Sequence, residues 1–307
     1  MSASSGGGLS GRWYDERLYL IPGLGYAQRF QVTRIVARAR SAFQDIVVFE
    51  NPAFGRVLAL DGAIQATEKD EFVYHEMLTH VPILAHGRVR QVLIVGGGDG
   101  GVLREVLRHR SVERATMVEI DGKVVDLCRE HMPSLSAGAF DDARAEVVID
   151  DGIKFVTETE RRFDVIVVDS TDPAGPGEVL FGPRFYKSCH ERLTRGGIVV
   201  TQNGVPFFQA KEDRDTSARL KPWFADFGFY VAACPSYVGG FMALAWATDD
   251  KRLRRLSLAT LAARFRKARL ETRYYTPAVH VGAFNLPPYV ATLMKQAKRE
   301  RWRPRSW

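Results

Sequence analysis

The stretch VLIVGGGDGG, Val92–Gly101, decides the fold of this chain. Its apolar start predicts a buried strand, and the helical spacing of apolar residues in 102–107 predicts a helix directly after it. Between them, Gly96, Gly98 and Gly101 fit the pattern G-x-G-x-x-G, a turn whose backbone approaches a ligand closely. The same pattern also occurs in strand-to-helix turns that bind nothing, so the glycines alone leave the ligand open.

Asp99, inside this loop, separates it from phosphate-binding loops. Gly97 and Gly100 flank the glycine–aspartate core and complete the glycine loop. Phosphate loops offer helix N-terminal N–H groups to an anion, and a carboxylate there would repel a pyrophosphate. Asp99 therefore predicts a ligand that brings positive charge to the turn.

Length and composition are those of a globular intracellular chain. The 307 residues suggest one large or two modest domains, and 46% hydrophobic residues provide a full core. Cys128, Cys189 and Cys234 show neither metal-site nor disulfide spacing. Together with the lack of a signal peptide or a long apolar span, this predicts a cytoplasmic location and no membrane. Residues 1–11 are small and polar, and we expect them to be disordered.

The net charge of +7 raises the question of nucleic acid, because the excess lies late in the chain. Residues 251–256 and 264–269 have helical spacing, which favours solvated helix faces. The basic tail, residues 295–307, places Trp302 and Trp307 among arginines and offers a surface for RNA, but the sequence favours a frayed basic terminus. We therefore do not expect nucleic acid as a partner.

Two kinds of pattern divide the chain. Residues 12–68 hold short β-branched runs separated by turn signals, which predicts a small antiparallel sheet. A helix is expected from about Asp70 to Leu84, kinked or ended by Pro82. From Arg90 onward strands alternate with helices, which predicts a doubly wound, mostly parallel α/β sheet.

Acidic residues follow four consecutive predicted strands, and ligands of such sheets bind outside the carboxyl ends of the strands. The acids are Asp99, then Glu119 with Asp121, then Asp150 with Asp151, then Asp169 with Asp172. Their mutual repulsion at one sheet edge needs cationic or hydroxyl-bearing ligands to offset it. A magnesium ion is one alternative for the last pair, but no phosphate-binding motif accompanies it, and an organic polyamine fits better.

A nucleoside is predicted by two of these positions. Glu119 stands 18 residues after Gly101 (119 − 101), where a carboxylate accepts ribose hydroxyls. Asp151 can receive the exocyclic amine of adenine while Gly152 leaves room for the ring. An Asp-Gly turn is the alternative for that pair. The loop that begins at Asp169 is rich in proline and glycine, as a lid requires.

Several ordered motifs carry a resemblance to a known family: GGGDGG, MVEID, IDDG, DSTDPAGPGEVLF, TQNG and YYTPAVH. The chain resembles the polyamine aminopropyltransferases (spermidine synthases) of bacteria, from Trp13 to Tyr289. The resemblance implies a β domain at 12–68 and a methyltransferase-like Rossmann domain with a seven-stranded sheet and basic tail at 69–307. It also implies a homodimer or homotetramer.

The resemblance assigns residues to the site. The nucleoside pocket would use Gln44, Glu119, Asp151, Gly152 and Pro176. Asp99 would hold the donor's amine, Asp169 would be the catalytic acid–base group and Asp172 would anchor the distal nitrogen of the acceptor. Residues lining the polyamine channel would be Tyr74, His75, Gln202 and Tyr237. For Tyr74 and His75, ordinary helix packing is an equal alternative from the sequence.

The implied reaction transfers an aminopropyl group from decarboxylated S-adenosylmethionine, a co-substrate, to putrescine. No metal and no other cofactor is expected, because the sulfonium already carries a neutral thioether leaving group. Val238 stands where acceptor length can be sensed, and the preference among diamines stays open. A methyltransferase of the same fold and a non-catalytic, RNA-associated protein are the alternatives, and Asp99 together with Asp169 and Asp172 disfavours both.

Overall fold

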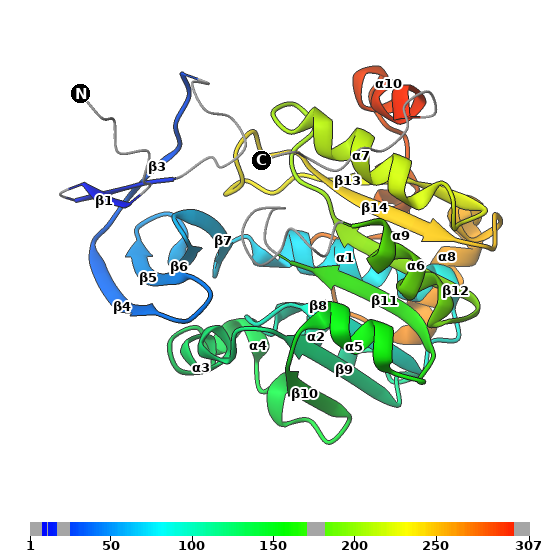
Figure 1. Cartoon of the computed structure of the whole chain (residues 1–307), viewed down its shortest axis with the longest axis horizontal. Helices are drawn as coiled ribbons and strands as arrows, with labels where there is room; N and C mark the ends of the chain where they lie inside the picture. The colour runs from blue at the N-terminus through cyan, green and yellow to red at the C-terminus, as the bar shows by residue number, and fades with distance from the viewer. Residues whose placement is uncertain (1–7, 11, 17–24, 171–181, 298–307) are drawn as a thin grey trace.

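The computed structural model describes residues 8–10, 12–16, 25–170 and 182–297. Its centre is a seven-stranded sheet in the order β10-β9-β8-β11-β12-β14-β13. In that order, the strands are Ala145–Ile149, Arg114–Glu119, Gln91–Gly96, Phe163–Asp169, Leu193–Gln202, Met242–Thr248 and Asp226–Ala232. The first five pair in parallel, and β14 pairs antiparallel with β12 and β13. This confirms the predicted mostly parallel α/β sheet (Figure 1).

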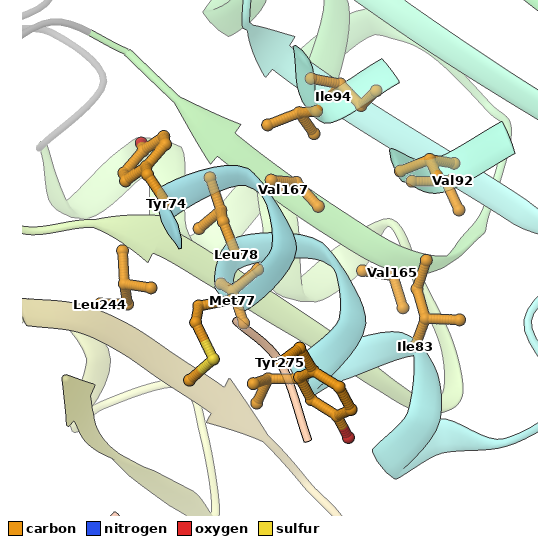
Figure 2. Close-up of a cluster of buried hydrophobic side chains, with 14 of the residues drawn as sticks. Tyr74, Met77, Leu78, Ile83, Val92, Ile94, Val165, Val167, Leu244 and Tyr275 are labelled. Atoms are coloured by element: carbon orange, nitrogen blue, oxygen red, sulfur yellow. The ribbon is translucent and has the colours of Figure 1, made fainter. Parts of the chain in front are cut away.

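Helices cover both faces of this sheet, which explains why its strands are apolar along their whole length. The side chains of Val92, Leu93, Ile94 and Val95 in β8 are all at most 1% exposed. One face packs against α1 (Glu71–His86), α2 (Gly101–Leu107) and the segment with α8 (Leu258–Ala268) and α9 (Pro277–Ala283). Figure 2 shows this core, with Tyr74, Met77, Leu78 and Ile83 of α1 lying against β8, β11 and β14. The other face packs against α5 (Gly152–Glu158), α6 (Pro183–Glu191) and α7 (Ala210–Leu220).

Helix α1 continues past Pro82, so the proline does not end it, and it extends two residues beyond the expected end near Leu84. It ends at Gly87, which adopts the left-handed conformation with φ 79° and donates its N–H to the carbonyl of Ile83. Pro82 removes only the one backbone donor that would reach Leu78. Burial of Leu78 and Ile83 against the sheet outweighs that loss, so the helix runs on to His86.

A small antiparallel sheet precedes the large one, as predicted. It consists of β4 (Arg34–Arg40), β5 (Asp45–Asn51), β6 (Gly55–Leu60) and β7 (Ala63–Thr67). One of its faces packs on α3 (Gly122–His131) and α4 (Pro133–Ser136). Its other face is covered by Tyr14 and Phe30, from β2 (Trp13–Asp15) and β3 (Arg29–Gln31). The small sheet thereby rests on the helix that follows the end of β9.

The two ends of the chain are described only in part. Gly8–Ser10 form strand β1, paired with β2, so this part of the segment expected to be disordered is ordered by backbone pairing. At the other end, α10 (Pro288–Ala297) packs on α7, and the remainder of the basic tail lies outside the described residues. Two short 3-10 helices, Ala139–Asp141 and Leu253–Arg255, complete the elements of the described residues. Among the described helices, none has the length and apolarity to cross a membrane.

Candidate active site

The sheet order brings the predicted acids to one edge. Strands β9, β8 and β11 are neighbours, so Glu119, Asp99 and Asp169 follow three adjacent strands at their carboxyl ends. One side-chain atom each of His75, Asp99 and Asp169 lies within 4.8 Å of the others. His75 reaches this group from α1, which lies across the sheet. Two of the predicted acids and the predicted histidine therefore share one small volume.

Asp169 ends β11 and faces this volume. Its Oδ1 accepts a hydrogen bond of 2.7 Å from the hydroxyl of Tyr74. Burial, followed by the charge of Asp99, raises the pKa of Asp169 to about 6. The backbone of Asp169 can lie this close to the glycine loop only because residue 96 is a glycine. Gly96 has φ +85°, and a Cβ there would lie 2.1 Å from the carbonyl oxygen of Asp169.

Asp99 is held by donors on both of its oxygens. Its Oδ1 accepts the backbone N–H of Gly101 at 2.7 Å, and its Oδ2 lies 3.4 Å from Nε2 of His75. Burial opposes the charged carboxylate, but the interaction with His75 outweighs burial and lowers the pKa of Asp99. Burial likewise opposes a charged His75, yet Asp99 and Glu71 raise the pKa of His75 to about 10. At neutral pH this pair is an imidazolium beside a carboxylate.

Glu71 and Arg104 belong to this site and were missed by the sequence reasoning. Nδ1 of His75 lies 2.6 Å from Oε2 of Glu71, which also lies 2.7 Å from a terminal nitrogen of Arg104. The spacing of Glu71 and His75, four residues apart on a predicted helix, was the available signal. The contact with Arg104 had no comparable signal, because it joins residues 33 positions apart. The ring of His75 thus contacts Asp99 as well as Glu71 of its own helix.

The predicted nucleoside residues lie beside the end of β9. Glu119 is 9% exposed and accepts the N–H of Asp121 at 2.9 Å, and burial raises the pKa of Glu119 to about 7. Gln44 comes from the small sheet and donates to Asp121 at 2.9 Å. Ser41 donates to the same carboxylate oxygen at 2.7 Å. Asp121 and Ser41 were not assigned from the sequence, and they are what joins Gln44 to this edge.

Asp151 and Gly152 begin α5 after β10. Oδ1 of Asp151 accepts the backbone N–H groups of Ile153 at 2.7 Å and Lys154 at 3.3 Å, so Asp151 caps the helix. The structure thus shows a helix cap at this position in place of the Asp-Gly turn given as the alternative. Gly152 is buried as the first residue of α5.

The predicted channel residues Tyr74, Tyr237 and Gln202 come from α1, from the segment between β13 and β14, and from the end of β12, the strand next to β11. The rings of Tyr74 and Tyr237 meet edge to face with centroids 5.8 Å apart, and Tyr237 donates to the carbonyl of Gln65 at 2.8 Å. Gln202, at the end of β12, is 3% exposed and accepts the N–H of Gly204 at 3.0 Å. A pocket of about 220 Å³, including space open to solvent, runs beside the tyrosines; its lining includes Asp70, Glu71, Tyr74, His75 and Tyr237. Asp172 and Pro176 lie outside the described residues.

Gly101 tests how tightly this site is packed. A Cβ at this position would lie 2.2 Å from the ring of His75, so we expect Gly101→Ala to displace the ring and destabilise the protein by about 1–3 kcal/mol. Gly282→Ala is the matched control, because a Cβ there meets nothing within 4 Å and alanine favours the helix. Thermal denaturation of both variants measures the difference. Equal melting temperatures for the two variants would contradict the packing described.

The doubly wound sheet, with acidic residues at the carboxyl ends of neighbouring strands, defines an α/β protein whose site suits a cationic ligand. Residues 71–256 match the spermine/spermidine synthase domain, and residues 13–68 match the spermidine synthase tetramerisation domain. The chain belongs to the spermine/spermidine synthase family.

Individual relatives agree with this assignment. The chain is 59% identical to polyamine aminopropyltransferase 1 of Pseudomonas aeruginosa, over 90% of this chain and 96% of that protein. It is 55% identical to the polyamine aminopropyltransferase of Pseudomonas syringae pv. tomato, over 94% and 99%. Among solved structures, a spermidine synthase in complex with the transition state analogue AdoDATO has a TM-score of 0.86 at 38% identity, covering 92% of this chain and 95% of that one. Spermidine synthase from Thermotoga maritima has a TM-score of 0.83 at 36% identity, over 92% and 94%.

Proposed function

We propose that this chain transfers the aminopropyl group of decarboxylated S-adenosylmethionine to putrescine, giving spermidine and 5′-methylthioadenosine. The observation that carries the proposal is a pair of carboxylates at the ends of two adjacent strands: Asp99, inside the glycine loop after β8, and Asp169, the last residue of β11. One can hold the donor's ammonium while the other meets the acceptor's amine. The family membership and the relatives named polyamine aminopropyltransferase support the same reaction.

The chemistry is a displacement at the carbon next to the sulfonium. The acceptor nitrogen forms a bond to that carbon, the carbon–sulfur bond breaks, and its electron pair leaves on the neutral thioether. The proton lost by the attacking nitrogen goes to Asp169. A carboxyl group with a pKa near 6 is ionised at neutral pH, yet it is a stronger base than an ordinary aspartate. Tyr74, which donates to Asp169, fixes the direction in which the free oxygen points.

The other predicted residues divide between the two substrates. We assign Glu119, Asp151 and Gly152 to the nucleoside, because they lie at or directly after the ends of β9 and β10. We assign Gln44 to it as well, because Gln44 donates to Asp121, two residues after the end of β9. We assign Tyr74, Tyr237 and Gln202 to the acceptor's methylene chain and amine. Asp172, for the distal acceptor nitrogen, and Pro176, for the nucleoside, stay predictions from the family resemblance.

A metal ion is the rival cation for the group formed by His75, Asp99 and Asp169. Coordination needs a lone pair on the imidazole, but the two ring nitrogens of His75 face Glu71 and Asp99. The arrangement therefore suits an ammonium, which donates hydrogen bonds to carboxylates, better than a metal ion. We propose that turnover needs no metal. The turnover rate measured after treatment with a chelator should therefore stay at the untreated value.

We expect kcat/KM to fall as the pH drops through about 6. Asp169 has its pKa raised, so the base is present above that value and is lost below it, well before an ordinary aspartate with pKa about 3.9 would protonate. A pH profile of kcat/KM reports the free enzyme and checks this limb. The pKa of Glu119 is also raised, to about 7, so protonation of Glu119 can contribute to the same fall in kcat/KM. The affinity for 5′-methylthioadenosine, measured over the same pH range, isolates the contribution of Glu119. An acidic limb near pH 4 would speak against Asp169 as the base.

We further propose that the chain assembles as a homodimer or homotetramer. The support is the match of residues 13–68 to a tetramerisation domain. Light scattering after gel filtration distinguishes the two states. The cytoplasmic location also stays a prediction; its support is the character of the three cysteines, which are free and buried.

The function is tested by incubating the protein with decarboxylated S-adenosylmethionine and a panel of diamines and identifying the products by mass. We expect spermidine and 5′-methylthioadenosine with putrescine. The same panel decides whether cadaverine or longer amines are accepted. Absence of 5′-methylthioadenosine with every acceptor would refute the proposal.

A further inference from the structure

A chain of alternating charges runs from the glycine loop into the protein. It passes from Asp99 to His75 at 3.4 Å, from His75 to Glu71 at 2.6 Å and from Glu71 to Arg104 at 2.7 Å. The side chains of His75, Glu71 and Arg104 are 2%, 8% and 15% exposed. Each contact is charge-assisted, and such contacts fix orientation strongly when they are withdrawn from water.

Arg104 is fixed at its other contacts too. Its Nε lies 2.9 Å from Glu105, and a terminal nitrogen donates to the backbone carbonyls of Ser134 and Leu135. The guanidinium thus joins α2, which begins at the glycine loop, to α1 and to the α4 segment. Packing between α2 and α4 does not require the additional ion pair between Arg104 and Glu71. That contact points toward the site.

We propose that Arg104 is a positioning residue, which holds Glu71 so that His75 orients the carboxylate of Asp99 toward the ammonium of the aminopropyl donor. This inference rests on the proposed function. This row of charged contacts affects only the binding of the donor's ammonium, because Asp99 is the residue assigned to that group. Glu119, which is assigned to the nucleoside, and Asp121, which holds Gln44, have no contact with Arg104, Glu71 or His75 among the described hydrogen bonds.

Two ligands separate positioning from general support of the fold. Decarboxylated S-adenosylmethionine carries the ammonium that Asp99 would hold, whereas 5′-methylthioadenosine shares the nucleoside and lacks the ammonium. Calorimetry would measure both dissociation constants for the parent and for Arg104→Met, Arg104→Lys and Glu71→Gln. Arg108→Met is the matched control, because Arg108 also pairs with Glu105, at 2.7 Å, but its recorded contacts do not include Glu71.

We expect Arg104→Met and Glu71→Gln to weaken binding of the decarboxylated donor by about tenfold, the effect of losing a charge-assisted contact. Binding of 5′-methylthioadenosine should stay within about twofold of the parent, and Arg104→Lys should recover part of the loss. Arg108→Met should leave both constants near the parent values.

Equal losses for both ligands, or equal behaviour of Arg104→Met and Arg108→Met, would overturn the positioning role. If Arg104→Met does not fold, Glu71→Gln and Arg104→Lys decide the question by the same ratio of constants. A parent protein that binds neither ligand would instead refute the proposed function.

Discussion

Asp169→Asn is expected to lower kcat by about 100- to 10,000-fold, the usual contribution of a positioned general base. Asparagine has nearly the same shape and can still accept the hydrogen bond from Tyr74, so the site should keep its form. It cannot accept the proton that the attacking nitrogen loses. Because Asp169 is assigned to the acceptor, binding of 5′-methylthioadenosine should be nearly unchanged. Single-turnover measurements with both substrates saturating report the chemical step.

Asp164→Asn is the matched control for this prediction, because Asp164 lies on the same strand but near its other end. It accepts the backbone N–H groups of Arg90 and Gln91, at 2.8 and 3.1 Å, and the hydroxyl of Thr194. Its replacement should affect stability and leave kcat within about threefold. A kcat for Asp169→Asn within tenfold of the parent would show that another group, or the solvent, takes the proton.

The strand-end acids show why so much of this fold could be predicted from the sequence. Val92–Val95 is apolar without alternation, which only a strand buried on both faces requires, and the glycines after it mark the turn. Once parallel strands are inferred, their carboxyl ends must meet at one edge, so Glu119, Asp99 and Asp169 could be placed together without any distance being known.

Contacts between distant segments mark the limit of such prediction. Gln44 reaches the site through Asp121, 77 residues away, and Arg104 reaches Glu71 across 33 residues. The periodicity of apolar residues indicates which face of a helix is buried, but it does not identify the polar residue from another segment that contacts that helix. Pro82 illustrates the same limit, because the local penalty of a proline was known while the packing that outweighs it was not.

Asp99→Asn is expected to reduce the preference for decarboxylated over ordinary S-adenosylmethionine by about tenfold to a hundredfold. Two like charges about 4 Å apart repel each other by about 4 kcal/mol at an effective dielectric constant of about 20. The nearby imidazolium of His75 and solvent in the cleft offset part of this, which leaves about 1.4–2.8 kcal/mol for one to two decades of affinity. The ordinary form carries an additional carboxylate beside the ammonium, and that group would meet Asp99. A neutral asparagine removes both the attraction and the repulsion.

The measurement is the dissociation constant of ordinary S-adenosylmethionine divided by that of the decarboxylated form. Calorimetry determines this ratio for the parent and for Asp99→Asn. Asparagine keeps a carbonyl oxygen for the N–H of Gly101, so the glycine loop should hold its shape. Binding of 5′-methylthioadenosine is the internal control, because it has neither the ammonium nor the carboxylate and should bind both proteins equally. A ratio that stays the same while this control holds would mean that discrimination arises elsewhere, and Asp99 would lose its assigned role. A lower ratio with an unchanged control would place the selection for the decarboxylated donor on the single carboxylate in the glycine loop.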